Sequence, residues 1–310
     1  PRKEPGLKLF ARKVLIQEFS KELLPQYLNF IDGVVDSEDL PLNVSRESVQ
    51  SNRVMTLLAR LVTGKALDML KELGDGSPED YAAFWETYGQ YLKEGVAVEQ
   101  DHPEKIFPLL RFHTSKDLTG WTSLDEYIER GGSDQKEIYY FLGEDPNAVK
   151  YSPHMDGFRK ADIEVLVLTD PVDPFMLMQL KSYEDHPLVN IAAAELPDSE
   201  QEEEKVQSDK PEVDPEDIAD MVLRFKSVLG DRVESVRTTH RLSDSPARLV
   251  DPEGAPEQSV QRVYRMMDKN FEIPKKVLEL NPNHKIILGL SKLPEGDPRF
   301  TLVAEQIYEN

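Results

Sequence analysis

The feature that most constrains the fold is an acidic stretch at residues 195–217, with the sequence ELPDSEQEEEKVQSDKPEVDPED. It holds three prolines, far more acids than bases and almost no large apolar residue. Such a segment cannot bury enough apolar surface to offset the entropy lost on ordering, so it predicts a solvated linker. The chain is therefore expected to divide into a domain of residues 1–195, an acidic linker at 196–214 and a smaller domain of residues 215–310.

The first domain alternates helical and extended patterns, which predict an α/β fold. The apolar runs IYYFL (138–142) and EVLVL (164–168) flank a short helical segment at 153–160. A strand–helix–strand order predicts a parallel pair of strands covered on both faces. Further expected elements are extended segments at Leu9–Gln17 and Val34–Val35, a helix over 45–73, a helix over 172–181 and a strand over 188–191.

Two helix starts in this domain have strong local signals. Ser77 and Pro78 are followed by acids, which is typical of an N-cap, a first helical position and a first turn. Ser123 and Glu126 have the spacing of a capping box. After the first of these starts, apolar side chains recur at helical spacing, and buried packing is favoured over a binding surface for them. They are Tyr81, Phe84, Trp85, Tyr88, Tyr91 and Leu92.

The second domain reads as α+β. An amphipathic helix is expected over 217–230, ending at Gly230, and the segments RVESVRTTHRL and PARLV have the character of two strands. Helices are then expected near 257–268, 282–290 and 298–309.

Composition excludes several classes of function. A net charge of −21 and a pI near 4.7 argue against nucleic acid or an anionic membrane as the main partner, because phosphate binding needs clustered Lys and Arg. No apolar run approaches the roughly 18 residues needed to span a bilayer. The chain has no cysteine, which excludes disulfides and thiol nucleophiles, and its six histidines are dispersed, so no metal site is expected.

Arg46 is a candidate anion-binding residue. It follows Ser45, a good N-cap, on the first turn of the helix expected over 45–73. A cation is unfavourable there by up to about 1 kcal/mol, because backbone N–H groups already carry partial positive charge, and the same end of a helix binds phosphates. Two readings stay open: an anion arrives from outside, or Arg46 pairs with the upstream acids Asp36, Glu38 and Asp39.

The segment around Arg46, LLPQYLNFIDGVVDSEDLPLNVSRESVQ (23–50), closely resembles the signature of the heat-shock protein 90 chaperone family in its middle domain. The resemblance covers nearly the whole chain. It continues in the family's order through TSLDEYIER (122–130), KEIYYFLGE (136–144), SPHMDGFRK (152–160), EVLVLTDPVD (164–173), VRTTHRLSDSPA (236–247) and LELNPNH (278–284).

The resemblance implies a role for Arg46 in ATP hydrolysis. In the family this arginine reaches the γ-phosphate of ATP that a separate N-terminal domain binds with Mg²⁺, and Gln50 corresponds to the glutamine beside it. No cofactor is expected in this chain itself, which should hydrolyse no ATP alone. The alternative from another class is a non-catalytic protein-interaction scaffold in which Arg46 is structural.

Two apolar segments are candidate contacts for non-native client proteins. Methionine and aromatic side chains suit promiscuous binding because they adapt to different partners. Relatives bind clients at the corresponding helix and beside the TDPVD segment, although core packing is the competing reading for both. The residues are Val260, Val263, Tyr264 and Met267 in the first segment, and Phe175, Met176 and Met178 in the second.

The resemblance also implies an assembly and a compartment. Family members form homodimers through further C-terminal helices, so this chain is expected to dimerise weakly or not at all. Its start at Pro1, without methionine, is typical of a piece of a longer protein. The expected compartment is the bacterial cytoplasm, with the mitochondrial matrix as the alternative.

Overall fold

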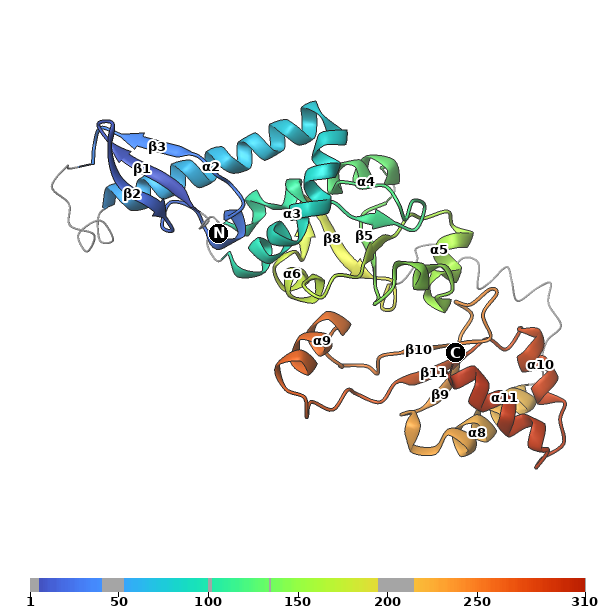
Figure 1. Ribbon diagram of the computed structural model, residues 1–310. Helices are drawn as coiled ribbons and strands as arrows, with labels where there is room; N and C mark the ends of the chain where they lie inside the picture. The colour runs from blue at the N-terminus through green and yellow to red at the C-terminus, as the bar shows by residue number, and fades with distance from the viewer. Residues whose placement is uncertain (1–5, 41–52, 100–101, 134, 195–214, 310) are drawn as a thin grey trace. The chain divides into compact units, whose positions relative to one another are not determined.

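The computed structural model describes residues 6–40, 53–99, 102–133, 135–194 and 215–309 (Figure 1). Within it the chain forms two compact units. Unit 1 comprises Pro1–Phe112, Trp121–Glu126 and Asp170–Tyr183, and unit 2 comprises His113–Gly120, Tyr127–Thr169 and Glu184–Asn310. The mixed sheets with surrounding helices confirm the α/β class, whereas the predicted domain boundary at 196–214 stays a prediction.

Unit 1 begins with a three-stranded sheet in the order β2–β1–β3. Its strands are β1 (Leu7–Ala11), β2 (Val14–Ser20) and β3 (Val34–Ser37). The expectation of one extended segment over Leu9–Gln17 was wrong, because the chain reverses at Arg12 and Lys13. Both residues have positive φ, 49° and 67°, as a two-residue hairpin turn requires. The backbone N–H of Lys13 donates to the carboxylate of Asp36 at 3.2 Å, which ties the turn to β3.

The helices of unit 1 supply most of its core. They are η1 (Gln26–Leu28), α2 (Arg53–Gly76), α3 (Pro78–Val98), η2 (Pro103–Lys105), η3 (Phe107–Leu109) and α6 (Asp173–Gln179). α3 begins at Pro78 as predicted, and it packs against α2 and α6. Tyr81, Trp85 and Leu92 are buried, which confirms core packing for that part of the helical pattern. Phe84, Tyr88 and Tyr91 instead cluster with Phe30, and Tyr91 is exposed.

Unit 2 contains a sheet in which four strands have the order β4–β6–β5–β8. They are β4 (His113–Thr114), β5 (Ile138–Leu142), β6 (Leu166–Leu168) and β8 (His186–Asn190). β5 is parallel to β6, as the apolar runs predicted, and it is also parallel to β8. The connecting helices are α4 (Leu124–Gly131), η4 (Pro146–Lys150), η5 (Pro153–Met155) and α5 (Asp156–Lys160). The capping box of α4 is confirmed, since Ser123 and Glu126 exchange hydrogen bonds of 2.7 and 3.1 Å.

The C-terminal part of unit 2 is α+β. Its elements are α8 (Pro215–Leu229), η6 (Gly230–Arg232), β9 (Val236–Thr238), β10 (Ala247–Val250), α9 (Gln258–Met267), β11 (Val277–Leu280), α10 (Lys285–Ser291) and α11 (Pro298–Glu309). The sheet order is β10–β11–β9, and α8 packs against α10 and α11 around Phe225 and Phe300. The sequence pattern did not predict the central strand, β11. α9 lies in the long connection between β10 and β11 (Figure 1).

An ion cluster runs across the C-terminal sheet. Glu279 on β11 lies directly opposite Arg248 on β10 and Arg237 on β9. Its carboxylate accepts from Arg248 Nε and Arg237 Nη2, each at 2.7 Å. Burial alone would raise the pKa of Glu279, but the guanidinium groups of Arg248 and Arg237 together outweigh burial and hold the pKa below its usual value. The buried carboxylate therefore stays charged and joins all three strands.

His154, on η5, lies close to this cluster. Its Nδ1 atom is buried, with no hydrogen-bond partner among the described residues. Burial, together with the positive charge of Arg248, lowers the pKa of His154 from 6.5 to about 4. The imidazole is therefore neutral in the folded protein near pH 7.

We expect His154 to make the chain acid-sensitive. Its pKa is lower in the folded than in the unfolded state, so its contribution to stability is present above pH 6.5 and lost as the pH falls toward 4. Between pH 7 and pH 5 the free energy of unfolding should fall by up to about 2 kcal/mol more in the wild type than in His154→Gln. Urea denaturation at both pH values measures this difference. The exposed His240→Gln serves as the control and should behave like the wild type.

Candidate functional site

The first candidate site is helix α9. Its ten residues carry two distinct faces. On one face Ser259 and Val263 are buried, with 0% and 5% of their surface exposed. On the other face Tyr264 and Met267 are 48% and 76% exposed.

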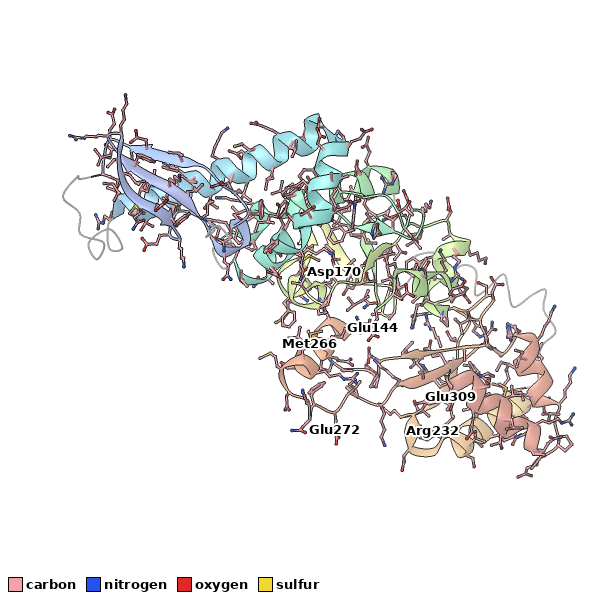
Figure 2. The ribbon with its side chains drawn as sticks, viewed as in Figure 1. Glu144, Asp170, Arg232, Met266, Glu272 and Glu309 are labelled. Atoms are coloured by element: carbon pink, nitrogen blue, oxygen red, sulfur yellow. The ribbon has the colours of Figure 1, made fainter. Side chains whose placement is uncertain are left out.

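The structure therefore divides the four residues that helical spacing grouped together. Val263 belongs to the buried face, Val260 is partly buried, and Tyr264 and Met267 point to solvent. Met266, which Figure 2 labels, is also exposed, and the ring of Phe271 lies 5.3 Å from that of Tyr264. These side chains make the outer side of α9 rich in methionine and aromatic groups.

The second candidate site is helix α6. Met178 is 49% exposed and Phe175 is partly buried, while Met176 is fully buried. The structure thus leaves Met178 and part of Phe175 available for a contact, and it places Met176 in the core of unit 1.

A buried ion cluster fixes the start of α6. Lys93 on α3 lies 2.5 Å from Asp170 and 2.8 Å from Asp173, the first residue of α6. The Asp173 side chain is 0% exposed, and its Oδ2 accepts from the backbone N–H of Asp170 at 2.8 Å. Lys93 also lies over the ring of Phe112, at 5.4 Å from the centroid. Figure 2 labels Asp170, the half-exposed member of the cluster.

The charge state of Lys93 follows from these contacts. Burial alone would lower the pKa of Lys93, but the carboxylates of Asp173 and Asp170 outweigh burial and raise the pKa above its usual value. The ammonium group is therefore charged, and the ion pair fastens α6 to α3 in the interior of unit 1.

Arg46 and Gln50, the predicted γ-phosphate contacts, lie outside the described residues. Among the residues that the structure describes, no group of three or more His, Cys, Asp or Glu side chains could hold a metal ion. None of the described helices has the length and apolar character needed to cross a lipid bilayer.

The sequence pattern predicted neither the cluster of Lys93, Asp170 and Asp173 nor a role for Arg262 on α9, which donates to the carbonyls of Gly143 and Leu142. A lysine next to Leu92 on a buried helix is a weak signal, because lysine stems commonly pass over apolar surface while their charge stays in water. Arg262 makes its contacts more than a hundred residues away in sequence. Local pattern carries no information about such a partner.

On these two helices, methionine and aromatic side chains lie exposed on a strongly acidic chain. The family is shown by comparison. The model of the Hsp90 protein family matches residues 1–310, so the chain belongs to the Hsp90 family.

Similar proteins carry the name Chaperone protein HtpG. The one from Myxococcus xanthus (strain DK1622) is 38% identical over 304 residues, which are 97% of this chain and 46% of that protein. The one from Nitratidesulfovibrio vulgaris (strain Hildenborough) is 40% identical over 306 residues, with 97% and 48% covered. The one from Alcanivorax borkumensis (strain SK2) is 41% identical over 293 residues, with 94% and 46% covered. The chain thus spans about half the length of these relatives.

Proposed function

We propose that the chain is the middle and C-terminal part of an ATP-dependent molecular chaperone that binds non-native client proteins. The observation that carries this proposal is the match of the Hsp90 family along the whole chain. Relatives named as chaperones support it. The exposed face of α9 and the exposed part of α6 are the client contacts in this proposal.

ATP and Mg²⁺ belong, in this proposal, to an N-terminal ATPase domain that precedes the chain in the full-length protein. Arg46 supplies a cation to the γ-phosphate when the two domains close on each other, and Gln50 lies beside it. A cation delivered from another domain stabilises phosphoryl charge only in the closed state, so hydrolysis depends on closure.

The assembly and compartment are also proposals. The full-length protein works as a homodimer in the bacterial cytoplasm as part of the heat-shock response. The bacterial sources of the relatives support this compartment over the mitochondrial matrix.

The client contact is tested by a double variant of α9. Tyr264→Ser with Met267→Ser should weaken binding of a reduced, carboxymethylated protein, which cannot refold, by about tenfold, because two apolar contacts are lost. Both side chains are exposed, so the fold should be retained. Fluorescence anisotropy of the labelled client measures the dissociation constant.

The matched control removes another exposed tyrosine and methionine. Tyr151, directly after η4, is 82% exposed. Met69, on α2, is 59% exposed. Tyr151→Ser with Met69→Ser should bind the client as the wild type does. Equal affinity of the α9 variant and the wild type would contradict the proposed contact.

A further inference from the structure

Helix α9 is held to the α/β sheet of unit 2 by polar contacts on its buried side. The guanidinium of Arg262 donates from Nη1 to the carbonyl of Gly143 and from Nη2 to the carbonyl of Leu142, both at 3.0 Å. Leu142 is the last residue of β5. Two parallel N–H groups on two successive carbonyls form a fork that only arginine can make.

A second contact reaches the neighbouring strand. Asn190, the last residue of β8, donates from its side chain to Gln258 Oε1 at 3.0 Å. Gln258 and Arg262 are four residues apart on α9, so they lie on one face of the helix. β5 and β8 pair in parallel, and Tyr140 lies opposite Asn190. The same face of α9 therefore contacts the carboxyl ends of two adjacent strands.

The N-terminus of α9 is fixed as well. Gln261 donates to the carboxylate of Asp251 at 2.9 Å and to the carbonyl of Pro256 at 2.7 Å. These partners lie in the connection that leads from β10 into α9, so they shape that connection without tying it to β5 or β8. The side-chain hydrogen bonds that reach the ends of β5 and β8 therefore come from Arg262 and Gln258.

Docking determines which apolar side chains α9 exposes. Val263 lies four residues after the fully buried Ser259, so it shares that face of the helix and is 5% exposed, while Tyr264 and Met267 face solvent. Helical spacing alone would place Val263 in the same apolar stripe as Val260, Tyr264 and Met267. Release of α9 from β5 and β8 would complete that stripe.

We propose that Arg262 is a positioning residue, which clamps α9 onto the ends of β5 and β8 and keeps Val263 out of the surface that α9 offers to clients. The inference rests on the proposed function for the identity of the partner. The clamp itself is a property of this chain and is measured without any client.

Hydrogen–deuterium exchange of this chain tests the clamp. In Arg262→Gln, the amides of residues 258–267 should exchange at least about tenfold faster, because docking loses its charge-assisted hydrogen bonds. Amides of β11 should exchange as in the wild type, which separates release of α9 from global unfolding. Arg262→Lys keeps the charge without the fork and should give an intermediate rate.

Arg265→Gln is the matched control. It removes the same charge from the same helix three residues further on, at an exposed position, and should leave exchange unchanged. Wild-type exchange in Arg262→Gln, or equal acceleration in both variants, would overturn the clamp. If Arg262→Gln fails to fold, the comparison of Arg262→Lys with Arg265→Gln decides in the same way.

Client binding by the same variants tests the consequence for the surface. Arg262→Gln should bind the carboxymethylated client about threefold more tightly, because Val263 joins the apolar face. Unchanged or weaker binding would overturn the role of the clamp in hiding Val263. Failure of the proposed function itself would appear separately, as wild-type binding by the Tyr264 and Met267 double variant.

Discussion

Replacing Lys93 with methionine is expected to lower the free energy of unfolding by about 3–5 kcal/mol, because it leaves the carboxylate of Asp173 buried without its counter-ion. The Asp173 side chain is 0% exposed and that of Lys93 is 6% exposed, so water cannot take the place of the lost ammonium group. Methionine keeps most of the packing volume, which confines the change to the charge. Urea denaturation followed by circular dichroism measures the loss.

An exposed lysine gives the control for this prediction. Lys65 on α2 lies 4.0 Å from Glu72, and both side chains are largely in solvent. Lys65→Met should change the free energy of unfolding by less than about 0.5 kcal/mol. A loss below about 1 kcal/mol for Lys93→Met would mean that Asp173 takes up a proton once the lysine is gone, because burial favours its neutral form.

Replacing Arg46 with alanine in the full-length protein is expected to lower ATP turnover about tenfold or more, while the dissociation constant for ATP barely changes. The guanidinium would act on charge that develops as the γ-phosphoryl group is transferred, so its loss affects the transition state more than the bound nucleotide. Steady-state turnover and nucleotide titration separate the two effects.

Arg53, an exposed arginine at the start of α2, is the matched control, and Arg53→Ala should hydrolyse ATP as the wild type does. Unchanged turnover in Arg46→Ala would favour the alternative reading, a scaffold in which Arg46 pairs with upstream acids. Arg46-dependent hydrolysis by this chain alone would contradict the placement of the ATP site in a separate domain.

Local signals in the sequence predicted those elements that local interactions determine. The apolar runs of β5 and β6 predicted their parallel pairing, and Ser123 with Glu126 predicted the capping box of α4. These predictions succeeded because a buried strand or a helix cap is specified by a few neighbouring residues.

Elements that depend on distant partners were missed. β11 has Glu279 in the middle of its apolar run, and that buried charge is neutralised by Arg248 and Arg237 on the neighbouring strands, far away in sequence. The turn at Arg12 and Lys13 has positive φ without the Asn or Gly typical of such turns, so the sequence carried no signal for it.

The candidate site was predicted in composition but not in orientation. Helical spacing identified the apolar residues of α9, yet it could not tell that Val263 is buried while Tyr264 and Met267 are exposed, since the docked side of α9 depends on Arg262 and its two distant carbonyl partners. On α6, likewise, spacing did not distinguish buried Met176 from exposed Met178.

The cluster that fastens α6 to α3 also has a consequence for biosynthesis. Lys93 precedes Asp170 by 77 residues. A ribosome that adds about 5–20 residues per second therefore completes the acidic partners roughly 4–15 seconds after the lysine. During translation α3 emerges with an ammonium group destined for a dry interior and nothing yet to neutralise it, so its final docking must wait for α6. In a nascent chain paused before residue 170, unit 1 would lack α6, and Lys93 would stay hydrated.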